Sequence, residues 1–145
     1  MKTISWDAAT CVIDAVGSLR IAIEARLCTQ QSGSRLRVVG GNLVTAKPIG
    51  VVDGVDFHHT GEVRRIDRKA ITRHLDEDDI VLLSSLGYSP TGEAFNLAAE
   101  DVATSVAVAL GADKLILFGE DTGIRDERGE LLRELKPTRA APLLA

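Results

Sequence analysis

Residues 80–118 read IVLLSSLGYSPTGEAFNLAAEDVATSVAVALGADKLILF, and this stretch decides the fold class. Residues 80–83 and 115–118 are short, continuously apolar runs, which are typical of strands buried on both faces of a parallel sheet. Residues 98–110 have apolar side chains at helical spacing, and Gly111 ends that predicted helix. A strand, a helix and a second strand form a right-handed βαβ unit. The sequence therefore predicts an α/β fold in which the two apolar strands lie side by side and parallel.

Further helices and strands are predicted on the N-terminal side of this unit. A long helix begins after its cap residue Asp7 and ends near residues 30–34. A shorter helix follows the cap residue Asp67. Strands are predicted at residues 36–39 and 42–47, because both segments are short and rich in β-branched residues.

Two hairpins and one long loop complete the predicted secondary structure. Residues 51–57 and 62–66 flank the polar connection 58–61, a pattern that favours a β-hairpin. Residues 126–129 favour the turn of a second, smaller hairpin. Residues 84–95 contain two glycines and several polar residues, and we expect a loop there.

The composition is that of a single globular domain and excludes several classes of protein. Of the 145 residues, 45% are hydrophobic and 26% are charged, so the chain can form a core and is not disordered. The net charge of −4 and the aromatic content of 3% argue against a nucleic-acid-binding protein. Apolar runs all fall short of the roughly 18 residues that a membrane helix needs, so we expect no membrane contact.

The two cysteines indicate a reducing compartment. Cys11 and Cys28 fall in the same predicted helix and would lie about 25 Å apart along it, which is too far for a disulfide bond. We expect both thiols to be reduced and buried as small apolar side chains. The first residues, MKTISW, lack the long apolar segment and the cleavage site of a signal peptide. The sequence therefore predicts a cytoplasmic protein.

The loop predicted at residues 84–95 is the first candidate for a binding site, because ligands of open α/β sheets bind beyond the carboxyl ends of the strands. Asn96 follows this loop and precedes a predicted helix, whose N-terminus favours anions. This residue has two explanations. Its side chain either caps the helix or contacts a ligand, and a cap is the commoner role of an asparagine at such a position.

Glu100, Gly40 and Gly41 are further candidates for substrate binding, each with a structural alternative. Glu100 lies in the first turn of the predicted helix, where an acid complements the helix dipole. The functional alternative is that Glu100 binds a substrate ammonium group or a metal ion. Gly40-Gly41 precedes Asn42 and resembles a turn that cradles phosphate, whereas a tight turn is the commoner outcome for such a pair. Composition does not separate these alternatives.

The sequence has no recognisable catalytic or metal-binding motif. The adjacent residues His58 and His59 point to opposite faces of an extended strand, so they do not chelate one metal ion, and there is no cysteine cluster. A P-loop, a dinucleotide-binding fingerprint and a nucleophile elbow are all absent from the sequence. We therefore predict no catalytic residue and no metal ligand.

Three long runs of the sequence resemble the amino-acid-kinase-like domain of bacterial N-acetylglutamate synthase. They are residues 39–67, 86–97 and 109–117, and the resemblance covers about residues 11–137. It implies the amino acid kinase (carbamate kinase-like) fold, with three α/β/α layers and a mainly parallel sheet. Elements that precede and follow this segment in the family are missing here. We therefore expect a partial domain at residues 1–137 and a tail at residues 138–145.

The family's enzyme transfers acetyl from acetyl-CoA to the amino group of glutamate, in the first step of arginine biosynthesis, and arginine inhibits it by binding the kinase-like domain. The resemblance therefore implies a regulatory and architectural role, with glutamate, acetylglutamate or arginine as the small-molecule ligand. Acetyl-CoA belongs to a separate acetyltransferase domain, so we expect no cofactor and no acetyl transfer in the isolated chain. Sheet edges left uncovered favour a homo-oligomer.

The resemblance also assigns individual residues. Asn96 matches the residue that holds acetylglutamate in the related kinases, and Glu100 stands where those kinases have a catalytic aspartate. Gly119 and Glu120 replace a Thr-Asp pair of the active kinases. Acids at these positions would repel a triphosphate, which disfavours the alternative of an acetylglutamate-kinase-like phosphotransferase. A second alternative is a non-catalytic module that binds arginine or a partner subunit.

Overall fold

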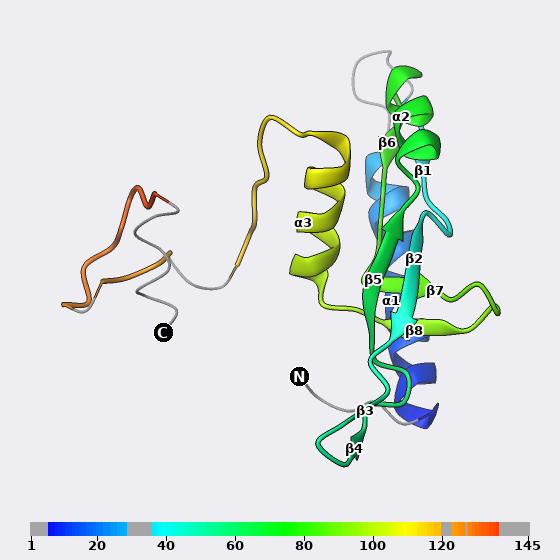
Figure 1. Cartoon of the computed structure of the whole chain (residues 1–145). Coiled ribbons are helices and arrows are strands. Elements are labelled where there is room, and N and C mark those ends of the chain that lie inside the picture. Colours follow the sequence, from blue (N-terminus) through cyan, green and yellow to red (C-terminus); the bar gives the residue numbers. More distant parts are fainter. Residues whose placement is uncertain (1–5, 29–35, 120–122, 127, 137–145) are drawn as a thin grey trace. The chain divides into compact units, whose positions relative to one another are not determined.

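The structure is a computed structural model that describes residues 6–28, 36–119, 123–126 and 128–136. The chain divides into two compact units, one that ends at Leu115 and one that begins at Ile116. All helices and named strands of the described residues belong to the first unit (Figure 1). The predicted α/β class is confirmed. Within the described part of the chain, no helix is both long and apolar enough to cross a bilayer.

Three helices occupy the predicted segments. α1 spans Trp6–Leu27, α2 spans Arg68–Asp76 and α3 spans Ala99–Leu110. Asp7 lies inside α1 rather than before it, so its predicted role as the cap is wrong. α3 contacts the sheet through β5 (Gly61–Ile66), whereas α1 contacts it through a different strand (Figure 1).

Two predictions at helix ends are confirmed. Asp67 caps α2, because its side-chain oxygen accepts a 3.0 Å hydrogen bond from the backbone N–H of Ala70. Gly111 ends α3 in the left-handed conformation, with φ 65°. Its N–H donates to the carbonyl of Val108, which satisfies a backbone group that the end of the helix leaves open.

The two cysteines are free and exposed, so the prediction that they are buried is wrong. Much of α1 faces solvent in the described structure, since Leu19 and Ile21 are each 61% exposed. Among the residues of this helix whose burial is described, 9–27, Ala9 is the buried one. Apolar spacing in a sequence indicates which face of a helix could be covered, but the covering residues come from elsewhere in the fold.

The strands of the described residues form three separate sheets. Their bounds are β1 Val38–Val39, β2 Val44–Pro48, β3 Val51–Val52, β4 Val55–Asp56, β5 Gly61–Ile66, β6 Ile80–Val81, β7 Leu86–Tyr88 and β8 Ala94–Asn96. β1 pairs with β6 in parallel, β3 pairs with β4, and the order β5-β2-β7-β8 forms a four-stranded sheet. In that sheet β2 is parallel to β7 and antiparallel to β5. Parallel and antiparallel pairing therefore occur together.

The apolar run at residues 80–83 contributes a parallel strand as predicted, but its partner differs. β6 pairs with β1, with Val38 opposite Ile80. Residues 115–118 form no strand, and Phe118 is 97% exposed. The predicted strand at residues 115–118 is therefore not found, and its pairing with residues 80–83, which would join the two units, stays a prediction. An apolar run becomes a strand only where a neighbour takes up its backbone N–H and C=O groups, and residues 115–118 have no such neighbour among the described strands.

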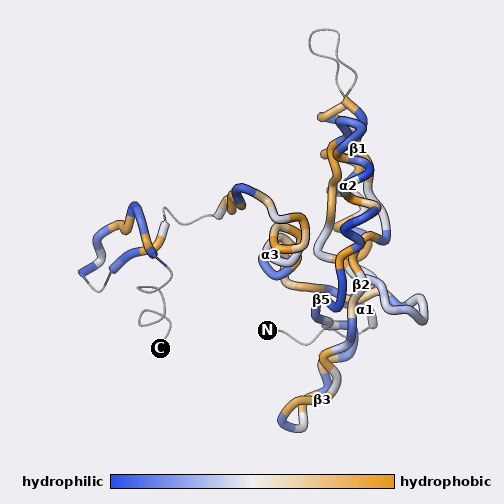
Figure 2. The backbone as a smooth tube through the Cα atoms, turned by 45° about the horizontal axis from the view of Figure 1, so that its top comes forward, coloured by the Kyte–Doolittle hydropathy of each residue, from blue (hydrophilic) through white to orange (hydrophobic). Residues whose placement is uncertain are grey.

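The region after β2 folds into two hairpins instead of the predicted one. β3 and β4 form a tight hairpin whose turn is Asp53-Gly54, with φ values of 52° and 79°. β5 pairs with β2 and not with residues 51–57. Asp-Gly favours a two-residue turn because both positions adopt positive φ. The prediction that residues 58–61 form the hairpin turn is therefore wrong. Figure 2 shows hydrophobic residues on the hairpin that β3 and β4 form instead.

The predicted loop at residues 84–95 contains another hairpin. β7 and β8 pair over three residues each, with Leu86 opposite Asn96. Ser89 closes the turn, because its backbone N–H donates to the carbonyl of Glu93 at 2.8 Å and its hydroxyl accepts from the N–H of Glu93 at 3.0 Å. Strands of three residues give too short an alternation of polar and apolar side chains for a pattern to indicate them.

The core lies between the four-stranded sheet and α3. Its buried members are Val44, Ala46, Phe95, Leu97 and Val102, with Val63, Ile66 and Val106 packed against them. Val44 and Ala46 alternate along β2 and therefore share one face of the sheet. Thr45 lies between them and belongs to the opposite face.

The second unit contains the predicted small hairpin. Arg125 and Leu131 form an antiparallel bridge. In the turn, the N–H of Gly129 donates to the carbonyl of Asp126 at 2.9 Å, and Gly129 has φ 79°. The predicted tail at residues 138–145 lies outside the described residues, and the domain boundary at residue 137 stays a prediction.

Ion pairs join the end of α2 to the chain beside β1. The Nε of Arg37 donates to Oδ1 of Asp79 at 2.5 Å, and Nδ1 of His74 lies 3.0 Å from Oδ2 of the same carboxylate. A second Arg37 nitrogen donates to Glu77 at 2.6 Å. The hydrogen bond from Arg37 lowers the pKa of Asp79 below its ordinary value, against the opposing effect of burial and with a further contribution from His74. The network therefore favours an ionised Asp79, whose side chain is only 2% exposed.

Acid should weaken the fold through Asp79. Because its pKa is lower in the folded chain than in the unfolded chain, the ionised carboxylate stabilises the fold above the ordinary aspartate pKa of about 4. This contribution is lost as the pH falls from about 4 through the lower pKa of the folded state. We expect Asp79→Asn to be less stable at pH 7 and to lose less stability between pH 7 and pH 3. Urea unfolding at several pH values measures both effects.

Asp76→Asn is the matched control for this experiment. Asp76 is an exposed acid near the end of the same helix, and it forms no ion pair with a described residue. Its variant should keep the pH dependence of the original chain. If Asp79→Asn also kept that dependence, Asp79 would not be the group that stabilises the fold.

A side chain at Gly87 should push β7 away from the core. A Cβ at this position would lie 2.7 Å from Cδ1 of Leu97 and 2.8 Å from Cβ of Ala46. Overpacking of this kind costs about 1–3 kcal/mol, so Gly87→Ala should lower the free energy of unfolding by that amount. Gly17→Ala is the control, because nothing lies within 4 Å of its Cβ and alanine favours the helix. Equal stability of the two variants in urea would contradict this packing.

Candidate functional site

A pocket of about 620 Å³ lies beside the four-stranded sheet and α2. Three segments surround it: the chain from β1 into β2, the chain from the end of β5 into α2, and the start of the β7–β8 turn. Its lining residues are Val39, Gly40, Gly41, Asn42, Leu43, Val44, Thr45, Arg65, Asp67, Ala70, Arg73, His74, Tyr88, Ser89 and Pro90. All of them belong to the first unit.

The sheet contributes one row of polar side chains to this pocket. Thr45 of β2 lies opposite Arg65 of β5 and also opposite Tyr88 of β7. The register between β2 and β5 shifts directly after Thr45, so that Ala46 faces Val63. A bulge of this kind redirects side chains. The row therefore combines a guanidinium, a hydroxyl and a phenol across three adjacent strands.

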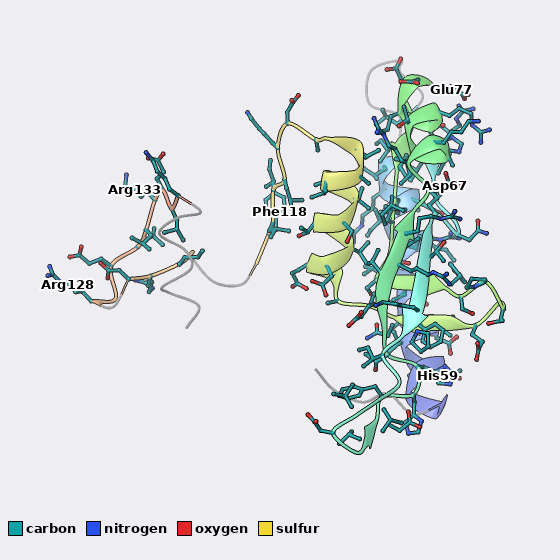
Figure 3. All side chains as sticks on the ribbon, viewed as in Figure 1. His59, Asp67, Glu77, Phe118, Arg128 and Arg133 are labelled. Carbon is teal, nitrogen blue, oxygen red and sulfur yellow. The ribbon has the colours of Figure 1, made fainter. Side chains whose placement is uncertain are left out.

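α2 contributes one of its faces. Ala70, Arg73 and His74 are spaced by three and four residues, so they lie on the same side of the helix and all line the pocket. Ile71 of the same helix is 1% exposed and does not line the pocket. The cap at Asp67 sets where the helix begins and hence which residues face the pocket, and Figure 3 shows Asp67 at the junction of β5 and α2.

The glycine pair lines the pocket with backbone instead of side chains. A Cβ at Gly40 would lie 2.8 Å from the carbonyl oxygen of Leu82, so the approach of β1 to β6 excludes any larger residue. Gly41 has φ 154° and open space around it. The structure thus gives Gly40 a packing role and Gly41 a turn role, and both residues also face the pocket.

The electrostatic balance of the pocket is positive. Arg65 and Arg73 supply two guanidiniums, and His74 is held by the carboxylate of Asp79. Among the described residues that line the pocket, Asp67 is the one acid, and its side chain already accepts from the N–H of Ala70. A pocket with these groups can hold carboxylate or phosphate oxygens through charge-assisted hydrogen bonds.

Asn96 and Glu100 lie away from this pocket. Asn96 ends β8, where its backbone N–H donates to the carbonyl of His59 at 2.8 Å. It does not cap α3, because Ala98 occupies the cap position without a side-chain hydrogen bond, so the cap explanation is wrong. Glu100 is exposed in the first turn of α3. The structure therefore brings Gly40 and Gly41 together, separates them from Asn96 and Glu100, and leaves the ligand role of all four as a prediction.

Sequence reasoning missed the charged residues of the pocket. Arg65, Arg73 and His74 were not among the candidates. The available signal was the concentration of basic residues on both sides of the cap residue Asp67, within residues 64–73. That signal indicates a positive surface, but it does not indicate that the glycine pair lies across from it.

Metal binding has no visible support in the described part of the chain. No group of three or more His, Cys, Asp or Glu residues there is arranged to hold a metal ion. His58 is exposed, and its backbone N–H donates to Asp56 at 2.9 Å. The ring of His59 instead lies 6.2 Å from that of Phe95.

Sequence comparison finds close relatives over almost the whole chain. The chain is 67% identical to the amino-acid acetyltransferase of Pseudomonas putida (strain GB-1), over 95% of this chain and 34% of the relative. It is 70% identical to the amino-acid acetyltransferase of Pseudomonas fluorescens (strain Pf-5), over 90% of this chain and 32% of the relative. The chain therefore spans about a third of the length of these curated relatives.

Solved structures agree with this relationship. N-acetylglutamate synthase from Neisseria gonorrhoeae, complexed with coenzyme A and N-acetyl-glutamate, matches 99% of this chain and 33% of its own, with a TM-score of 0.90 and 36% identity. The same enzyme with coenzyme A and L-arginine matches with a TM-score of 0.90 and 34% identity. The sequence profile of the amino acid kinase family covers residues 7–141. The resemblance found in the sequence is thus confirmed, and the chain belongs to the amino acid kinase family.

Proposed function

We propose that this chain is the amino-acid-kinase-family domain of an enzyme that makes N-acetylglutamate from acetyl-CoA and glutamate. The observation that supports this most directly is the 67–70% identity to amino-acid acetyltransferases over 90–95% of the chain. The fold of N-acetylglutamate synthase, matched over 99% of the chain, supports the same assignment.

The role of this domain is regulatory and architectural. We place acetyl-CoA binding in the part of the enzyme outside this chain, because the chain matches only about a third of the synthase that was solved with coenzyme A. Acetylglutamate, glutamate or arginine is the small molecule that we assign to this domain, in line with the ligands named for the solved synthases. Within it, we propose Asn96 and Glu100 as ligand-facing residues where β8 leads into α3.

Phosphotransfer fits the chain less well. Glu100 is an exposed acid in the first turn of α3, where a carboxylate opposes an approaching triphosphate. Glu120 is the second acid that stands where the active kinases differ from this chain, and it lies outside the described residues. We also propose that the enzyme is cytoplasmic. We further propose that it is a homo-oligomer, and light scattering on the purified chain tests this oligomeric state.

A domain exchange tests the proposed function. The segment of the Pseudomonas putida amino-acid acetyltransferase that matches this chain is replaced by the chain itself. Because 67% of the aligned residues are identical, the hybrid should fold and form acetylglutamate from glutamate and acetyl-CoA. We expect activity within about tenfold of the unaltered enzyme, since the reacting groups lie outside the exchanged segment. Acetyl transfer is measured as release of the coenzyme A thiol.

The controls separate a failed fold from a wrong function. The isolated 145-residue chain should release no coenzyme A thiol, and it should not consume ATP in the presence of acetylglutamate. A hybrid that is folded by circular dichroism but inactive would contradict the proposal. ATP-dependent phosphorylation of acetylglutamate by the isolated chain would instead favour the kinase alternative.

A further inference from the structure

Basic side chains gather at the junction of β5 and α2. Residues 64–73 contain Arg64, Arg65, Arg68, Lys69 and Arg73 with a single acid, in a chain whose net charge is −4. All five are exposed. Figure 3 shows nitrogen-bearing side chains close to Asp67 at this junction. A local excess of one charge creates a potential that attracts ligands of the opposite charge.

Two of these arginines face the pocket without an ion-pair partner. Arg65 and Arg73 line the pocket, and neither forms an ion pair with any residue that the structure describes. Some of the other basic side chains that the structure describes do form ion pairs. Arg37 contacts Asp79 and Glu77, and Lys47 contacts Glu62 at 2.9 Å. The pocket is therefore a place where the fold brings guanidiniums together and leaves them available.

The pocket has the size and the polar groups of a small-molecule site. Its volume of about 620 Å³ falls in the usual range of ligand pockets, about 300–1,000 Å³. Gly41 adds no side chain to the space, and the hydroxyls of Thr45 and Tyr88 lie in the same cross-strand row as Arg65. The two hydroxyls can donate further hydrogen bonds to an anion that a guanidinium binds through two N–H groups.

We propose that this pocket binds a small anion with at least two charged oxygens, either a phosphate group or a dicarboxylate, between Arg65 and Arg73. A guanidinium binds such oxygens in a bidentate manner, and two of them match a doubly charged ligand. A cationic ligand such as free arginine is repelled by the same two groups. The site is separate from Asn96 and Glu100 and does not depend on the proposed acetyltransferase role.

Calorimetry on the 145-residue chain tests this site with inorganic phosphate, with glutarate and with arginine as a cationic control. We expect saturable binding of phosphate or glutarate in this pocket, whereas any binding of arginine to the chain should be unchanged by substitution of Arg65 or Arg73. Whichever of the two anions binds more tightly identifies the chemistry of the natural ligand. Arg65→Gln and Arg73→Gln should each weaken binding by about 10- to 100-fold, because each removes a charge-assisted hydrogen bond.

Arg68→Gln is the matched control variant. It removes the same charge from the same cluster, but Arg68 does not line the pocket. We expect it to weaken binding by less than about threefold, since it changes only the long-range field. Thermal unfolding confirms that each variant is folded. Absence of saturable binding to both anions, or an equal loss in Arg68→Gln, would overturn the proposal without affecting the domain exchange.

Discussion

Close packing around β2 constrains the whole first unit. Ala46 in this strand is 0% exposed, and glycines face the strand from both of its neighbours. A Cβ at Gly61 of β5 would lie 2.8 Å from the carbonyl of Lys47, and a Cβ at Gly87 of β7 would lie 2.8 Å from Cβ of Ala46. Larger residues there would separate the strands and break their hydrogen bonds. The same contacts set the register, and the register places the polar row that lines the pocket.

Local signals in the sequence were sufficient where structure depends on a residue and its near neighbours. The cap at Asp67, the end of α3 at Gly111 and the strand at residues 80–83 were predicted because each depends on a backbone preference within one turn or one strand. The tight turn at Asp53-Gly54 belongs to the same class. Asp-Gly favours this turn through the positive φ of both residues, and the prediction of a turn at residues 58–61 missed it.

The sequence did not indicate which segments lie next to each other in the fold. Residues 80–83 and 115–118 are equally apolar, yet β6 pairs with β1 and residues 115–118 form no strand. Asn96 illustrates the same limit, because β8 holds its backbone in the sheet and leaves the helix cap to Ala98. Arg65 lies at the pocket because β5 places it opposite Thr45, and long-range register is not visible in a local pattern.

The uneven pairing of charges links the fold to ligand binding. Exposed arginines repel each other weakly in the unfolded chain, where they are far apart and well solvated, whereas the fold brings Arg65 and Arg73 to one pocket. That arrangement costs some stability unless an anion compensates it. An anion that binds only the folded chain raises the free energy of unfolding. When its concentration exceeds its dissociation constant, the increase grows with the logarithm of the ratio of the two. A site of this kind would therefore couple the stability of α2, and of the Asp79 network at its end, to the presence of its ligand.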